Sequence, residues 1–241
     1  MNNLIPRIED ELTVEILCRN AIQQLDSVNH TPLSRDICIA RSLNKYLLHS
    51  NKPLPPATIA WMEQEIQLPA AKASVMELNE KYLALQRRKL VGNSLKSSDD
   101  VEGMSDGEKI LRKLIDPYKG KFILLDIWGT WCAPCKAALK NSQEEYERLN
   151  PYDIVYLYLA NRSDEESWKN VIKEYNVTGD NVVHYNLPSE QQTAIEYFLG
   201  VNSFPTYKLI DRDGNILDVN ADPRDLNALE NLLKTMNGTN N

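Results

Sequence analysis

Long apolar runs are missing from this chain of 241 residues. No stretch approaches the roughly 18–20 consecutive apolar residues that a membrane-spanning helix needs. The N-terminus, MNNLIPRIEDELTVE, is acidic and has no apolar central segment, so it does not have the pattern of a signal peptide. Two compartments stay open on these grounds: the cytoplasm, or the outside of the cytoplasm for a mature exported domain.

Basic charge is scarce in the C-terminal part of the chain. Residues 1–91 carry 11 basic and 10 acidic side chains, whereas residues 92–241 carry 16 and 24. Nucleic-acid binding needs a clustered basic surface, so this imbalance argues against DNA or RNA as a partner. The net charge of −7 is explained most simply by solubility.

Cysteine is also sparse, with only Cys18, Cys38, Cys132 and Cys135. Four cysteines in a chain of this length do not build a disulfide scaffold. Cys18 and Cys38 fall on two neighbouring predicted helices. They would either pair in an oxidising compartment or remain two buried thiols.

Residues 1–91 are predicted to form a helical N-terminal domain. Apolar residues recur at helical spacing over residues 8–28, 33–47, 59–66 and 75–85, which indicates a small antiparallel bundle. The next segment, residues 92–107, is polar and rich in Ser, Asp and Gly, so a linker or a long connecting loop is expected there.

Residues 108–241 show the alternation of an α/β domain. The pattern predicts helices over 134–149, 164–175, 189–199 and 225–236, and strands over 122–128, 154–160, 182–185, 206–210 and 216–219. The strand at 122–128 is apolar throughout, as in a strand buried on both faces. A mixed central sheet with helices on both faces is therefore expected.

The segment that carries chemistry is Trp131-Cys132-Ala133-Pro134-Cys135-Lys136, where the buried strand turns into a helix. Two intervening residues let both sulfurs approach disulfide distance across the first helical turn. The helix N-terminus favours a thiolate on Cys132, which is the expected nucleophile. Cys135, one turn further in, would then resolve the mixed disulfide.

A metal site is the competing interpretation of the cysteine pair. A zinc site would need a second pair of ligands, and the chain offers only Cys18 and Cys38, which are twenty residues apart, and three scattered histidines. We therefore expect a redox pair, no bound metal and no organic cofactor. No role is assigned to His30, His49 or His184.

Two segments resemble thioredoxin-fold thiol–disulfide oxidoreductases of the bacterial TlpA-like group. The first is YKGKFILLDIWGTWCAPCK at 118–136, and the second is FLGVNSFPTYKLIDRDG at 198–214. They occur in the expected order, about seventy residues apart. The resemblance covers residues from about 105 to the C-terminus and leaves the helical N-terminal part outside.

The resemblance implies roles for four further residues. Pro205 would be a cis-proline facing the disulfide, and Phe204 before it would touch the bound partner. Asp126 would be a buried acid with a raised pKa that accepts the proton Cys135 must lose, rather than a strand-end residue pointing to solvent. Trp131 would be an exposed apolar platform beside Cys132, whereas Trp128 is expected in the core.

The direction of electron flow is predicted from positions at which this chain differs from other members of the group. Some of its members carry a glutamate three residues after the second cysteine, where this chain has Ala138. The Ala133-Pro134 dipeptide is close to the Gly-Pro of general thioredoxins and favours a reductase. A peroxidase is disfavoured, because Gly129 stands where such sites carry a threonine.

We therefore expect a dithiol reductase of protein disulfides, supplied with electrons by an unidentified thiol reductase. The resemblance also implies a periplasmic or otherwise extracytoplasmic location, with the cytoplasm as the alternative. Two other functions stay open. One is a disulfide oxidase or isomerase, and the other is a binding module whose helical N-terminal region is the working part.

Overall fold

Proline begins each described helix in the N-terminal part of the chain, in a first turn that has no amide hydrogen bond to lose. These helices are α2 (Pro32–Ser50), α3 (Pro56–Glu65) and α4 (Pro69–Arg87). The Thr31 hydroxyl caps α2 by accepting from the Ser34 amide at 3.2 Å. The computed structural model describes residues 31–90 and 92–238, with Val14, Ile16, Asn20 and Gln23. It divides the chain into two compact units, Met1–Arg88 and Lys89–Asn241.

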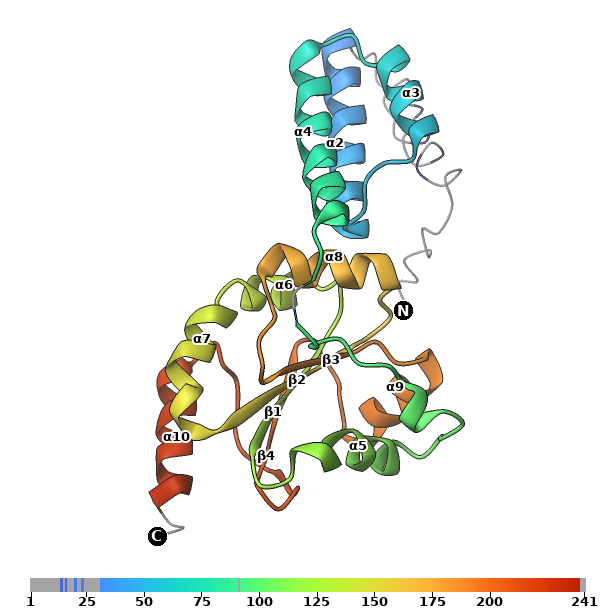
Figure 1. Cartoon of the computed structure of the whole chain (residues 1–241). Helices are drawn as coiled ribbons and strands as arrows, with labels where there is room; N and C mark the ends of the chain where they lie inside the picture. The colour runs from blue at the N-terminus through green and yellow to red at the C-terminus, as the bar shows by residue number, and fades with distance from the viewer. Residues whose placement is uncertain are drawn as a thin grey trace. The chain divides into compact units, whose positions relative to one another are not determined.

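Helices α2 and α4 run side by side in the first unit (Figure 1). Their apolar faces share one core, in which Leu43, Met62, Val75 and Tyr82 are almost fully buried. The helices predicted over 33–47, 59–66 and 75–85 are thereby confirmed. The predicted helix over 8–28 lies almost entirely outside the described residues, and so does Cys18. Cys38 is half-buried and forms no disulfide with a described residue.

The second unit is built on a five-stranded sheet of order β3-β2-β1-β4-β5. The parallel strands are β1 (Phe122–Trp128), β2 (Ile154–Ala160) and β3 (Val182–Tyr185). The antiparallel strands are β4 (Thr206–Ile210) and β5 (Ile216–Leu217). The predicted mixed sheet is confirmed.

Helices cover both faces of this sheet (Figure 1). One face packs against α6 (Ala133–Leu139), α7 (Ser142–Leu149), α8 (Glu165–Tyr175) and α10 (Leu226–Gly238). The other packs against α5 (Gly107–Ile115) and α9 (Ser189–Phe198). Alternate residues of β1 point into the two cores, which explains why this strand is apolar throughout.

Three sequence expectations need correction in the second unit. Of the two alternatives for residues 92–107, the connecting loop fits and the linker does not, because Leu95 bridges to His184 on β3 and Val101 is fully buried. The single helix expected over 134–149 is two helices, α6 and α7, separated at residues 140–141. Helix α5 was not predicted; it approaches α9 so closely that a Cβ on Gly107 would lie 2.0 Å from the Ala194 carbonyl oxygen.

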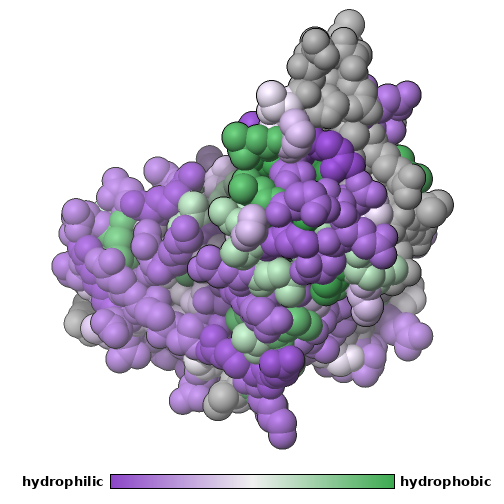
Figure 2. All heavy atoms as spheres, turned by 90° about the horizontal axis from the view of Figure 1, so that it is seen from above, coloured by the Kyte–Doolittle hydropathy of each residue, from purple (hydrophilic) through white to green (hydrophobic). Residues whose placement is uncertain are grey.

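The face shown in Figure 2 is mostly hydrophilic, with hydrophobic atoms in small separate patches. Among the described residues, no helix is both long enough and apolar enough to cross a membrane. Trp131 is one of the few large apolar side chains that the described part of the chain exposes to solvent.

Candidate redox site

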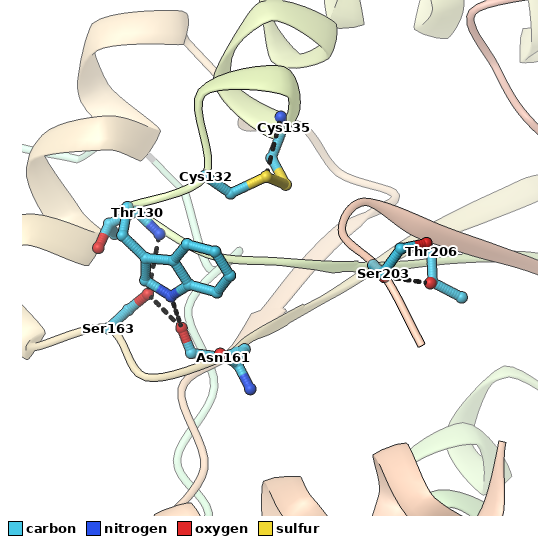
Figure 3. The surroundings of a disulfide bond; sticks show 8 residues. Thr130, Cys132, Cys135, Asn161, Ser163, Ser203 and Thr206 are labelled. Atoms are coloured by element: carbon cyan, nitrogen blue, oxygen red, sulfur yellow. Dashed lines mark hydrogen bonds between the residues drawn. A yellow bond between two sulfur atoms is a disulfide. The ribbon is translucent and has the colours of Figure 1, made fainter. Parts of the chain in front are cut away.

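Cys132 and Cys135 form a disulfide at the junction between β1 and α6 (Figure 3). The Cα atoms are 5.3 Å apart and the sulfurs 2.05 Å. Cys132 occupies the N-cap of α6, and its Sγ accepts from the Cys135 amide at 3.2 Å. Both residues are buried, Cys135 more completely than Cys132. The roles of Cys132 as attacking and Cys135 as resolving sulfur stay predictions.

The turn that leads into the disulfide is held by the loop after β2. The Thr130 amide donates to the Ser163 hydroxyl at 3.0 Å, and the Trp131 indole Nε1 donates to the Asn161 carbonyl at 3.1 Å (Figure 3). Gly129 leaves room for that indole, because a Cβ there would lie 2.6 Å from Nε1. These contacts fix Trp131 beside Cys132 while its ring stays 38% exposed.

Asn161 is itself held by a carboxylate on α9. Its amide donates to both oxygens of Glu196, at 2.8 and 3.0 Å, and Gln192 donates to the same carboxylate at 2.8 Å. The Glu196–Asn161–Trp131 chain therefore connects α9 to the indole. Because the three residues have no recognisable spacing in the sequence, this arrangement was not predicted.

Phe204 and Pro205 lie in the segment before β4, and the peptide bond between them is cis, as the resemblance implies. The Phe204 ring packs edge-on against Trp131 with 5.3 Å between ring centroids. The Thr206 hydroxyl donates to the Ser203 carbonyl across this turn at 2.6 Å (Figure 3). Trp131 and Phe204, some seventy residues apart in sequence, are thus in contact.

Asp126 is buried in β1, with 6% of its surface exposed, and does not point to solvent. It lies on the face of the sheet that carries the disulfide, between Tyr158 of β2 and Tyr207 of β4, which are its register partners. Its Oδ1 has no hydrogen-bond partner in the structure. Burial raises the pKa of Asp126 well above its usual value, and the Asp222 carboxylate adds to the rise.

A second buried carboxyl group belongs to Glu145 on α7, which the sequence analysis did not select. Burial, with a contribution from Asp126, raises the pKa of Glu145 to about 8. The available signal was its position four residues before Leu149, on the apolar face of the helix. An acid on such a face is a candidate for an unusual role.

His184 is fully buried in β3, where its Nε2 lies 2.8 Å from the Val177 carbonyl oxygen. Its ring stacks on Tyr158 with 4.7 Å between centroids. Burial lowers the pKa of His184 to about 4, so the imidazole is neutral at physiological pH. No cluster of three or more metal-ligating side chains occurs within residues 31–90 and 92–238 or the four isolated described positions.

Comparison with known proteins shows what the part of the chain that carries the disulfide is similar to. Residues 120–216 match the family model described as thioredoxin-like. The chain is 29% identical over 113 residues to the thiol-disulfide oxidoreductase ResA of Bacillus cereus strain ZK / E33L, covering 47% of this chain and 60% of that protein. It is 28% identical over 129 residues to ResA of Bacillus thuringiensis subsp. konkukian, covering 54% and 69%.

Among solved structures, the chain is similar to the pneumococcal exposed lipoprotein thioredoxin Etrx1 of Streptococcus pneumoniae strain TIGR4. The identity is 26%, the shared part covers 50% of this chain and 89% of that one, and the TM-score is 0.41. The residues matched by the family model, 120–216, lie within the second unit.

Proposed function

Because residues 120–216 are a thioredoxin-like domain related to the thiol-disulfide oxidoreductases, we propose that this chain reduces disulfide bonds in proteins. The observation that carries the proposal is the Cys132–Cys135 disulfide, which lies at a strand-to-helix junction directly beside the Trp131–Phe204 contact. The buried acid Asp126 lies on the same face of the sheet as this disulfide.

The reaction runs from the reduced form of the pair. The Cys132 thiolate attacks one sulfur of the substrate disulfide, and the other substrate sulfur leaves as a thiolate that takes a proton from solvent. Cys135 then loses its proton to Asp126 and attacks Cys132 in the mixed disulfide. Two electrons pass to the substrate, whose second thiolate is released, and the Cys132–Cys135 disulfide forms.

Trp131 and Phe204 supply the surface against which the substrate lies. Their edge-on contact makes a continuous apolar platform beside Cys132. The substrate is thus a disulfide that is accessible enough to lie on this platform.

The direction toward reduction is supported by the Ala133-Pro134 dipeptide, which lacks the polar or histidine residues that accompany oxidants. A reductase leaves each cycle oxidised, so it needs an electron-donating thiol reductase as a second partner. We place both reactions outside the cytoplasm, where protein disulfides persist and need a dedicated reductant.

The first test is insulin reduction together with the reduction potential of the pair. We expect turnover that Cys132→Ser abolishes, a mixed disulfide that Cys135→Ser traps, and a potential near or below roughly −250 mV. Turnover that survives Cys132→Ser would refute the proposal. A potential near roughly −120 mV would make the protein an oxidant and reverse the proposed direction.

A further inference from the structure

Glu145 is a buried acid for which the proposed reaction, as written above, has no use. It is 7% exposed, and its Oε1 is buried without a hydrogen-bond partner. Burying an unpaired carboxylate is costly, so a retained acid in such a place is either neutral or coupled to another titrating group. The neighbouring contacts show which group that is.

Two tyrosines of β2 connect Glu145 with Asp126. Tyr156 donates its hydroxyl to the backbone carbonyl of Glu145 at 3.3 Å. The hydroxyl of Tyr158, the register partner of Asp126, lies 2.8 Å from the hydroxyl of Tyr146, which follows Glu145 in the chain. Both acids therefore lie over the same stretch of the sheet, on the face that holds the disulfide.

The remaining groups around the two acids offer little positive charge. Arg224 is the cation that acts on Asp126, and it is already bonded to Asp222 at 2.8 and 2.9 Å. The other titratable groups facing the acids are neutral or acidic; they are Tyr146 of α7, Tyr156 and Tyr158 of β2, His184 of β3, Tyr207 of β4, and Asp222 before α10. Within the described residues, neither acid has a cation of its own.

We propose that Glu145 is a positioning residue for proton transfer, because its carboxyl group and that of Asp126 hold one proton between them when the pair is ready to act. The role of Glu145 in the reaction rests on the proposed function, whereas the shared proton does not. Two carboxylates without a buried cation cannot both ionise at moderate cost, so the first ionisation suppresses the second. The Asp126 carboxylate raises the pKa of Glu145, which is the direction expected when Asp126 ionises first.

The shared proton lets the site receive a proton without creating a second buried charge. Before the resolving step, one carboxyl of the pair is ionised and the other is neutral. Cys135 transfers its proton to the ionised carboxylate of Asp126 and becomes the thiolate that attacks Cys132. The pair is then fully neutral, and it returns one proton to solvent before the next cycle.

The test is a carboxyl titration of the oxidised full-length chain by ¹³C NMR. Neither cysteine titrates in that form, so the measurement does not depend on turnover. We expect Asp126→Asn to lower the midpoint of Glu145 by about one pH unit, because a like charge has been removed. Glu144→Gln, an exposed acid one residue earlier on α7, is the matched control and should leave that midpoint unchanged.

A Glu145 midpoint that is the same in Asp126→Asn and in the unsubstituted protein would overturn the inference, as would an equal shift in Glu144→Gln. If Asp126→Asn does not fold, the titration of the unsubstituted protein still tests the inference. Coupled acids titrate in two steps that each appear at both carboxyl carbons, whereas independent acids give one step each. A protein that fails to reduce insulin yet shows the coupling would refute the function and leave the shared proton standing.

Discussion

Each unit of this protein buries an aspartate, and the two aspartates are treated very differently. Asp36 on α2 is 4% exposed, close to the 6% of Asp126 on β1. Oδ2 of Asp36 accepts two backbone amides, those of Gln67 and Leu68, at 2.8 and 2.7 Å. Oδ1 of Asp126 accepts nothing, and the nearest cation is shared with another carboxylate.

The difference agrees with a structural role for Asp36 and with the chemical role proposed for Asp126. Asp36 satisfies the amides that precede α4 and so ties the start of that helix to α2. Asp126 contributes no such contact and is held in a place that disfavours its charge. Equal burial therefore carries no functional meaning by itself; the hydrogen bonds that the buried group makes decide its role.

The largest effect should come from removing the structural acid. Asp36→Ala leaves two amides near the start of α4 without acceptors, and we expect it to destabilise the helical unit by about 2–4 kcal/mol. Urea unfolding followed by far-UV circular dichroism measures the loss. Asp36→Asn keeps one acceptor oxygen and should cost less. An equal loss in both variants would mean that the charge, and not the amide contacts, matters.

The opposite result is expected for Asp126→Asn. Since its folded pKa is raised above 3.8, the stability linked to this group is present at pH below 3.8 and is lost as pH rises through the folded pKa. Asp126→Asn should therefore be more stable than the unsubstituted protein at pH 8, by about 1–3 kcal/mol. It should also slow the resolving step by about 100-fold.

Unfolding at pH 5 and pH 8, with the rate of mixed-disulfide resolution, tests both halves of this prediction. The gain in stability should be larger at pH 8 than at pH 5. A variant that is less stable at pH 8, with an unchanged rate of resolution, would make Asp126 a structural acid like Asp36 and erase the comparison.

Asp126 was easier to predict from the sequence than the residues around it. Asp126 stands out because it interrupts an apolar strand six residues before Cys132, and each strand of the sheet has a local apolar pattern. Glu145 lies between exposed acids of the same helix, and its position four residues before Leu149 is the one sequence feature that distinguishes it from Glu144. Contacts between distant segments leave no such pattern, which is why Glu196 and the bridge between Leu95 and His184 were missed.

His184 is a buried base in the second unit, and its lowered pKa makes the stability of that unit depend on pH. Its folded pKa of about 4 lies below the ordinary 6.5, so the stability linked to it is full above pH 6.5 and is lost as pH falls toward 4. His184→Gln cannot take up that proton and should lose less stability between pH 7 and pH 4, by about 2 kcal/mol. Unfolding curves at both pH values measure it. Equal losses of stability between pH 7 and pH 4 in the two proteins would mean that a group other than His184 causes the pH dependence.

The smallest effect should come from the hydrogen bonds that position Trp131. Glu196→Gln replaces a carboxylate that accepts three hydrogen bonds by an amide, which loosens Asn161 and the carbonyl that holds the indole. A charge-assisted hydrogen bond weakened by about 1 kcal/mol corresponds to roughly a fivefold rise in KM for a protein disulfide, with kcat nearly constant. Acrylamide quenching should increase, because Trp131 is the most exposed tryptophan among the described residues.

Glu190→Gln, an exposed acid in the first turn of the same helix, is the control for that variant and should change neither quantity. If Glu196→Gln instead lowers kcat at constant KM, the carboxylate acts on the chemical step and not on the aromatic platform. Glu196 would then belong with Asp126 among the acids that act in the chemistry. The satisfied carboxyl groups of this protein would no longer be structural as a class, and hydrogen-bond satisfaction would cease to distinguish Asp36 from Asp126.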